Sequence, residues 1–369
     1  MRRQIIRLLL SLLLIPPVIA MVLGWLVAPA FLHPIRRPLT PDLVQQADAS
    51  LGQTGVYRET FDVRAPDGIL LRGWKVRAAH PNGSWILLFH GVADNRMGVI
   101  EHALILLRAG YSVTLMDARA HGESEGPIGT YGWLERNDTR AMIDALVAAE
   151  HPAHIFALGE SMGAGIALQS AGVDPRIEAV VAEASFASLR EASYDYAGLQ
   201  KYPWLGKTLF APGAWVMLAR GQSLAGFRAA GVSPEHAVAA RAFPVLLICD
   251  AADTVLPCRH SEKIYAAARG PKSLWVVPGA FHTAALGFAR VEFKRRVLQF
   301  FADPTVVPIH KMSTEDNTDN SSAPSAVPLS KVLLPASVAG LRLDSRMRSS
   351  LRTRSSFTAG CALAPGSVL

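Results

Sequence analysis

The stretch that decides the fold is HIFALGESMGAGIALQSAG, residues 154–172. Residues 154–159 are mostly apolar and typical of a buried strand, and residues 162–172 have the composition of a helix. Between them lies GESMG, residues 159–163, which has the pattern G-x-S-x-G. The pattern alone is a weak signal, but a serine on a sharp strand-to-helix turn has the setting of a nucleophile. Small neighbours make room for such a strained turn. We therefore take Ser161 as the candidate nucleophile.

A serine hydroxyl becomes reactive only when a base accepts its proton and an acid orients that base. His282 is the candidate base, because it lies in a loop just past a predicted strand. The acid is expected between the two, in PVLLICDAADTVLP, residues 244–257. We favour Asp253, in the loop beyond the strand, over Asp250, which we interpret as a turn residue. The other histidines after the serine lie on predicted helices or near the C-terminus: His236, His260 and His310.

The sequence around this stretch alternates between apolar strands and helices. Strands are predicted over residues 73–79, 84–91, 111–122, 177–185, 244–250 and 273–279. Helices are predicted over residues 97–110, 134–150 and 290–302. This alternation predicts an α/β fold with a mostly parallel central sheet flanked by helices. Residues 190–232 are aromatic and glycine-rich without a strand pattern, so they predict a helical cap inserted over the sheet edge.

The first 37 residues predict a single transmembrane anchor. Residues 8–32 contain no charged side chain over 25 positions, which is long enough to cross a bilayer, and Trp25 suits the far interface. The alternative is a signal peptide cleaved after Ala30, although this apolar run is long for one. Three arginines precede the run and two follow it. This weak bias predicts that the main domain, residues 38–303, lies on the non-cytoplasmic side.

The net charge of +7 does not indicate a nucleic-acid-binding protein. Five arginines and no acidic residue lie in residues 1–37, and five arginines with one aspartate lie in residues 341–354. The rest of the chain is therefore slightly acidic and offers no basic face. Residues 304–369 are polar and Arg/Ser-rich, so we expect a mostly disordered tail.

Cysteine and histidine usage predicts no cofactor chemistry. Three cysteines are too few for a disulfide framework, and Cys249 and Cys258 are expected to be unpaired, mostly buried thiols. The histidines show no spacing typical of metal ligands. We therefore expect neither a metal nor an organic cofactor, and the oligomeric state is not predicted.

Five motifs in this order resemble the α/β-hydrolase superfamily. They are LLFHG (87–91), DARAHGESEG (117–126), GESMGAG (159–165), PVLLICDAADTVLP (244–257) and GAFHTAAL (279–286). Within the superfamily, the chain resembles membrane-anchored bacterial hydrolases of the serine-aminopeptidase-like (S33) and Bem46-like groups. The resemblance covers about residues 55–302 and is specific for the superfamily, not for a substrate.

The resemblance implies a catalytic role for three of these positions. Ser161 matches the nucleophile, Asp253 the acid and His282 the base, in the order that this fold uses. Gly159 and Gly163 match the small residues that support the nucleophile's turn. Cys249-Asp250 departs from the His-Gly that the family usually has before the acid, which leaves the local turn open.

The resemblance also implies an oxyanion hole. His90-Gly91 matches the pair before the first donor, so the backbone N–H groups of Val92 and Met162 are the implied donors. The DARAHGESEG segment matches a loop that shapes the sheet edge, with Ala120 in place of the usual glycine. His121 in that loop is expected to be structural.

The expected function is that of a serine hydrolase that cleaves esters or thioesters with acyl or lipid-like groups through an acyl-enzyme intermediate. A peptidase or amidase with the same site is the first alternative, because the three catalytic residues do not distinguish them. A catalytically idle binding domain is the second. The aromatic residues of the cap either line an acyl pocket or pack its helices together: Tyr194, Tyr196, Tyr202, Trp204, Phe210 and Trp215.

Overall fold

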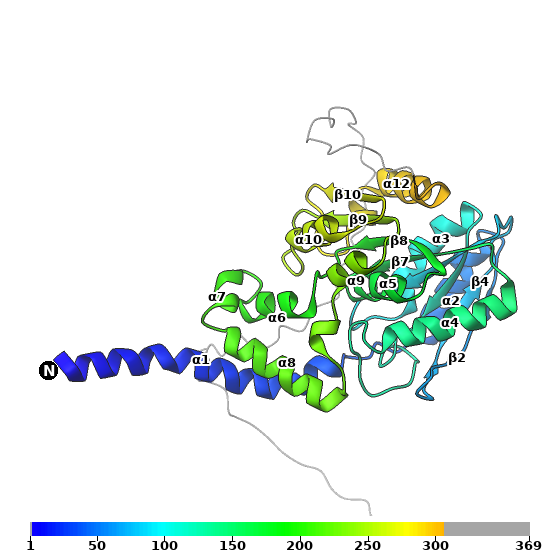
Figure 1. Cartoon of the computed structure of the whole chain (residues 1–369). Helices are drawn as coiled ribbons and strands as arrows, with labels where there is room; N and C mark the ends of the chain where they lie inside the picture. The colour runs from blue at the N-terminus through cyan, green and yellow to red at the C-terminus, as the bar shows by residue number, and fades with distance from the viewer. Residues whose placement is uncertain (1, 306–369) are drawn as a thin grey trace, which may run out of the picture. The chain divides into compact units, whose positions relative to one another are not determined.

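The computed structural model describes residues 2–305, and an eight-stranded sheet forms its centre (Figure 1). The strand order is β1-β4-β6-β5-β7-β8-β9-β10, with β1 and β4 antiparallel to their neighbours and β6 through β10 parallel. The strands are β1 (Arg58–Thr60), β4 (Gly73–Val76), β5 (Ser84–Phe89), β6 (Ser112–Met116), β7 (His154–Glu160), β8 (Ile177–Glu183), β9 (Val245–Asp250) and β10 (Lys272–Val277). A separate short hairpin joins β2 (Val63–Arg64) and β3 (Leu70–Leu71). The predicted mostly parallel sheet is confirmed.

Helices cover both faces of the sheet, because side chains on a buried strand point alternately to each face. On β5, Ile86 and Leu88 belong to one core and Leu87 and Phe89 to the other. The first core includes side chains of α2 (Pro41–Gly52), α3 (Ile100–Arg108), α11 (Ala285–Phe288) and α12 (Arg290–Ala302). The second includes side chains of α4 (Glu135–Glu150), α5 (Met162–Val173), α9 (Pro234–Ala240) and α10 (Arg259–Ala267).

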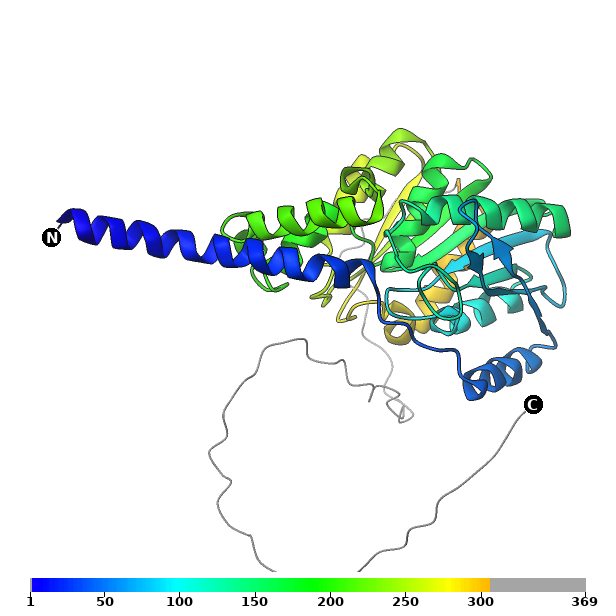
Figure 2. The same ribbon diagram turned by 90° about the horizontal axis from the view of Figure 1, so that it is seen from below.

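The predicted helical cap is inserted between β8 and β9. It consists of α6 (Leu189–Ala197), α7 (Pro203–Lys207), α8 (Ala211–Ala225) and the short 3₁₀ helix η2 (Ala229–Gly231). The Ser188 hydroxyl caps α6 by accepting the Glu191 N–H. The N-terminal helix α1 (Arg2–Leu32) lies alongside α8 in both ribbon views (Figures 1 and 2).

Two expectations need correction. The helix predicted over residues 97–110 begins as a 3₁₀ turn, η1 (Arg96–Val99), which Asn95 caps by accepting the Met97 N–H. Cys249 and Cys258 were expected to be unpaired, but the structure joins them in a disulfide. The loop after β9 turns back sharply, so that the two Cα atoms come within 5.3 Å, a separation typical of disulfides.

The predicted C-terminal tail, residues 304–369, lies outside the described residues from 306 onward. The N-terminal run is a helix whose segment Leu14–Leu32 has a mean hydropathy of 2.1. By length and composition it suits a membrane span or a signal sequence equally.

Candidate active site

Ser161 occupies the sharp turn between β7 and α5, as the sequence predicts. Its backbone has φ 52° and ψ −115°, a conformation that non-glycine residues rarely adopt. Its N–H donates to the Glu183 carbonyl at 2.9 Å, which ties the turn to the neighbouring strand β8. The residue is only 7% exposed. The turn therefore holds the hydroxyl in a fixed place at the carboxyl end of the sheet.

Gly159 and Gly163 make this turn possible by close backbone approach. A Cβ at Gly159 would overlap the backbone of Gly163, and a Cβ at Gly163 would overlap the carbonyl groups of Phe89 and His90. The start of α5 is thus pressed against the end of β5. The structure thus places both glycines, which the sequence analysis named as supporting residues, at this turn.

Gly163→Ala is expected to destabilise the fold by about 3 kcal/mol, because the added methyl group meets backbone atoms that cannot rotate away. Chemical denaturation monitored by circular dichroism measures the change. Gly52→Ala is the matched control: it lies at the end of helix α2 with no atom within 4 Å of the added methyl group, so no loss of stability is expected. Equal stabilities for the two variants would contradict the tight approach at Gly163.

His282 and Asp253 meet Ser161 in a continuous chain of hydrogen-bond contacts. His282 Nε2 lies 2.9 Å from Ser161 Oγ, and His282 Nδ1 lies 2.6 Å from Asp253 Oδ2. The three residues come from the ends of β7, β9 and β10 and the loops that follow them. Parallel strands bring their carboxyl ends to one edge of the sheet, which explains why residues far apart in the sequence meet here.

The Asp253 carboxylate is fixed by its own loop. Its Oδ1 accepts the N–H groups of Val255 at 2.7 Å and Leu256 at 2.9 Å, which leaves Oδ2 for His282. The Asp253 side chain is fully buried, whereas that of His282 is 23% exposed. Asp250, the alternative acid, lies at the end of β9 and makes no hydrogen bond to the imidazole. The structure thus places Asp253, the acid that the sequence favoured, in contact with the His282 imidazole.

The two implied oxyanion donors lie beside the serine. A Cβ at Gly91 would be 3.7 Å from the Ser161 Cβ, so the Gly91–Val92 peptide adjoins the nucleophile. Met162 is the first residue of α5, and the N–H of a first helical residue has no partner within its helix. In the described part of the chain, neither the Val92 nor the Met162 N–H is engaged by an acceptor.

His90 orients the peptide that carries one of these donors. Its Nε2 accepts the Ala118 N–H at 3.0 Å, so the proton resides on Nδ1, which donates to the Gly91 carbonyl at 2.7 Å. In a planar trans peptide the C=O and the following N–H point in opposite directions. Holding the Gly91 carbonyl therefore directs the Val92 N–H away from the His90 ring.

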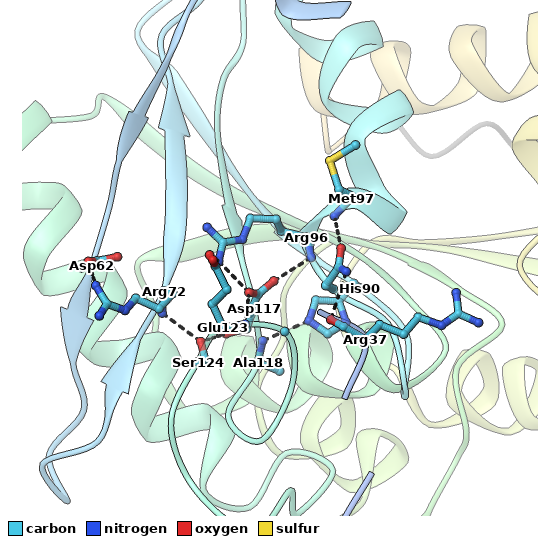
Figure 3. A network of polar contacts seen from close by, with 12 residues as sticks. Arg37, Asp62, Arg72, His90, Arg96, Met97, Asp117, Ala118, Glu123 and Ser124 are labelled. Carbon is cyan, nitrogen blue, oxygen red and sulfur yellow. Dashed lines mark hydrogen bonds and ion pairs between the residues drawn. The ribbon is translucent and has the colours of Figure 1, made fainter. Parts of the chain in front are cut away.

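A buried polar network surrounds Arg96, which follows this loop in the sequence (Figure 3). Asp117 accepts the Arg96 N–H at 2.7 Å, the Arg96 guanidinium at 2.6 Å and the Glu123 N–H at 2.8 Å. Arg96 is 2% exposed and also contacts the Glu123 carboxylate at 2.7 Å. Removing one partner of such a buried pair would leave an uncompensated charge. Because Asp117 also binds the Arg96 backbone N–H, the network fixes the end of the loop that contains Val92.

A cluster of buried carboxyl groups lies next to the nucleophile and includes Glu160, the residue before Ser161. Glu160 and Glu183 are register partners at the ends of β7 and β8, and His102 lies near them, with one nitrogen or oxygen of each residue within 4.8 Å of the others. Burial raises the pKa of Glu183 to about 8, with a further contribution from Asp250, and raises that of Glu160 well above its usual range. Burial lowers the pKa of His102 to about 4.

This cluster is the group of described residues whose donor atoms could hold a metal ion. The raised carboxyl pKa values and the lowered imidazole pKa favour neutral side chains near pH 7. Glu183 Oε1 also accepts the Ala285 N–H at 2.9 Å, three residues after His282. The cluster therefore helps to fix the loop that carries the base.

Glu183→Gln is expected to flatten the pH dependence of the melting temperature between about pH 5 and pH 8. Because the folded pKa, about 8, lies above the ordinary value of 4.5, the folded state keeps a proton that the unfolded state releases. That contribution to stability is complete below pH 4.5 and is lost as the pH rises through 8. Glutamine stays neutral, so its variant loses less stability over this interval.

The control for this variant is Glu178→Gln, which replaces an exposed carboxylate on the same strand. Differential scanning calorimetry at several pH values measures both variants. The same dependence on pH in wild type and Glu183→Gln would contradict a neutral buried carboxyl at this position.

The other histidines that the sequence raised lie in structural settings. His260 is 1% exposed and contacts Asp195 at 2.6 Å through Nε2, while its Nδ1 accepts the Ala187 N–H at 3.2 Å, so it joins α10 to the cap. His121 Nδ1 contacts the Arg119 carbonyl at 2.9 Å, and burial lowers its pKa to about 4. His236 lies on α9, and His310 lies outside the described residues.

Sequence reasoning missed two groups of supporting residues. Arg96 was not singled out, because its burial against Asp117 has no local signal in the sequence. Glu160 and Glu183 did carry one, because each lies at or near the end of a predicted strand, residues 154–159 and 177–185, in a sheet predicted to be parallel. Two neighbouring parallel strands that both end in glutamate place those carboxyl groups side by side.

The sheet order and the strand–serine–helix turn define an α/β-hydrolase fold. A family described as "Serine aminopeptidase, S33" matches residues 80–222. The uncharacterized protein Rv2307c of Mycobacterium tuberculosis is 34% identical over 223 residues, which cover 60% of this chain and 70% of that protein. The chain therefore belongs to the S33-like family of α/β-hydrolases and is a hydrolase.

Two further similarities bear on activity and fold. The lysophosphatidylserine lipase ABHD12 of Danio rerio is 26% identical over 273 residues, which cover 66% of each chain. The esterase Pf2001 of Pyrococcus furiosus has a solved structure that superposes with a TM-score of 0.57 and 22% identity, over 73% of this chain and 98% of that one. The latter similarity supports the fold alone.

Proposed function

We propose that the protein is a serine hydrolase that cleaves carboxylic esters or thioesters, with Ser161 as nucleophile, His282 as base and Asp253 as acid. The observation that carries the proposal is the contact chain of 2.9 Å and 2.6 Å from Ser161 through His282 to Asp253. Contacts of this length allow the imidazole to take the serine proton while the carboxylate stabilises the resulting positive charge.

In the proposed reaction, Ser161 Oγ attacks the substrate carbonyl carbon as His282 Nε2 takes its proton. The Val92 and Met162 N–H groups stabilise the negative oxygen that forms; such a donor typically contributes about 10²–10³ in rate. Collapse of this intermediate expels the alcohol or thiol, which receives the proton from His282. His282 then deprotonates a water molecule that attacks the acyl-serine, and the carboxylic acid leaves as Oγ regains its proton.

An acyl or lipid-like substrate is favoured by two observations. The cap between β8 and β9 exposes aromatic side chains, among them Tyr196, Trp204 and Trp215. A relative is named a lysophosphatidylserine lipase, whose substrate is a lipid ester. The alternative is a peptidase or amidase, because the matching family is described as a serine aminopeptidase.

A panel of p-nitrophenyl esters of increasing acyl length, run beside aminoacyl-p-nitroanilides, tests the choice between these reactions. The proposal predicts hydrolysis of the esters, with a preference that depends on acyl length. Hydrolysis of the anilides alone would instead establish the peptidase, and hydrolysis of neither would favour a binding domain.

We also propose that residues 1–37 remain as a single-pass membrane anchor and that residues 38–303, with the cap at about 190–232, form the catalytic domain on the non-cytoplasmic side. The end of α1 is built into that domain: Leu32 is fully buried, and the Tyr131 hydroxyl donates to the Phe31 carbonyl at 2.9 Å. Cleavage after Ala30 would remove the helix that covers Gly213.

A further inference from the structure

The contact between α1 and α8 places part of the cap beside the membrane helix. The two helices run in the same direction, since Ala20 and Gly24 of α1 meet Gly213, and Phe31 lies 3.9 Å from the position of a Cβ on Gly221. A Cβ at Gly24 would overlap the Gly213 carbonyl, and a Cβ at Gly213 would overlap that of Ala20. Such glycine contacts let helices approach closely and are typical of helix pairs within a membrane.

One pair of side chains marks the level at which the bilayer ends. The Arg220 guanidinium lies 3.4 Å from the centre of the Trp25 ring and donates to the Trp25 carbonyl. Tryptophan and arginine are both favoured at the boundary between hydrocarbon and water. The charge-free run from residue 8 to Trp25 is about 27 Å long as a helix, which matches the hydrocarbon thickness of about 30 Å.

The first half of α8 then lies on the membrane side of this level. Residues 211–219 contain no charged side chain, and Gly213 packs between Ala20 and Gly24 of α1, which lie about 2 to 8 Å on the membrane side of Trp25 along the helix axis. That depth is typical of helices that insert into the headgroup and acyl boundary of a bilayer. Trp215, on this half of α8, is 57% exposed and donates from Nε1 to the Tyr194 hydroxyl.

The surface of the cap next to this segment is apolar and basic. Leu199 is 76% exposed and Trp204 is 63% exposed, and residues 196–234 contain four basic side chains and no acidic one, with Lys207 alone paired to a carboxylate, that of Glu191 on α6. Exposed large apolar side chains together mark an interaction surface, and basic residues beside them attract anionic headgroups. Lipid is the partner that fits both features at the end of a membrane helix.

We propose that α7 and the first half of α8 insert into the bilayer leaflet next to the catalytic domain, with α1 as their partner within the membrane. This surface, defined by Leu199, Trp204 and Trp215, is called here the lipid-facing cap. The inference rests on the proposed retention of α1 as an anchor. It places the cap where a substrate can reach it from the membrane, rather than from water.

Tryptophan quenching in nanodiscs tests the lipid-facing cap. The full chain is placed in discs of phosphatidylcholine and phosphatidylglycerol, with or without bromine on the acyl chains. Trp204→Phe/Trp215→Phe is expected to reduce the fluorescence that bromolipids quench by about threefold, because only Trp25 of the three tryptophans at the bilayer remains. The same double variant is expected to leave quenching by iodide in the water phase unchanged.

Two substitutions serve as controls. Trp275→Phe removes a tryptophan that is 8% exposed outside the cap and should not change bromolipid quenching. Tyr57→Trp adds one at a position that is 80% exposed outside the cap, and it should add emission that only iodide quenches.

Three results would overturn the proposal. Quenching of Trp204 and Trp215 by iodide, without quenching by bromolipid, would show that the cap lies in water. Protection from both quenchers, with a doubled mass, would assign the surface to a second copy of the chain. If Trp25→Phe did not change bromolipid quenching, α1 would not lie in the membrane. Labelling of Ser161 by a fluorophosphonate in the same discs reports separately on hydrolytic function.

Discussion

Ser161→Ala is expected to lower kcat/KM for ester hydrolysis by about 10⁴-fold or more, because no other group can form the acyl intermediate at this turn. The substitution removes only the hydroxyl group. The alanine keeps a Cβ at residue 161, so the backbone there has the same steric strain as with serine. The fold should therefore stay intact, which circular dichroism can check. Steady-state kinetics with the best p-nitrophenyl ester of the panel measures the loss.

Ser170→Ala is the matched control for this variant. Ser170 is a fully buried serine on the same helix α5, where its hydroxyl contacts Thr139 Oγ1 at 3.1 Å, and it does not contact His282. Its loss should change kcat/KM by less than about tenfold. Residual activity of Ser161→Ala within tenfold of wild type would assign the chemistry to another residue.

Asp253→Asn is expected to lower kcat/KM by about 10³–10⁴-fold, the second largest effect. The amide oxygen can replace Oδ1 as acceptor for Val255 and Leu256, so the NH₂ group then faces His282 Nδ1. A donor there forces the imidazole to carry its proton on Nε2, which leaves no acceptor for the Ser161 hydroxyl. Kinetics above pH 7 measure this change of tautomer as a loss in kcat.

Asp250→Asn is the control that separates the two candidate acids. Asp250 lies at the end of β9, whereas the imidazole contact is made by Asp253, so asparagine at position 250 leaves the contact with His282 in place. We expect a change of less than about tenfold in kcat/KM. A larger loss for Asp250→Asn than for Asp253→Asn would reverse the assignment.

The positions of the proposed catalytic residues could be located from the sequence because they follow strand ends. Ser161, Asp253 and His282 each follow a recognisable apolar strand, and a parallel sheet gathers such positions at one edge. The sequence favoured Asp253 over Asp250, and the loop geometry directs the Asp253 side chain toward the imidazole.

Contacts that depend on three-dimensional packing alone could not be predicted. The charge-free run of residues 8–32 predicted a membrane span and residues 190–232 a helical cap, but neither signal pairs Gly24 with Gly213. The pairing of Cys249 with Cys258 depends on how the loop after β9 turns, which the departure from the family's His-Gly left open. Arg96 resembles an ordinary surface arginine until the structure shows it buried against Asp117.

The most direct test of the account is covalent labelling of Ser161. The full chain is treated with a fluorophosphonate, digested and analysed by mass spectrometry beside the Ser161→Ala variant. The account predicts a single adduct on the peptide that contains Ser161, slower labelling in Asp253→Asn, and none in Ser161→Ala. Equal labelling of wild type and Ser161→Ala, or an absence of adduct on the folded wild-type protein, would contradict it.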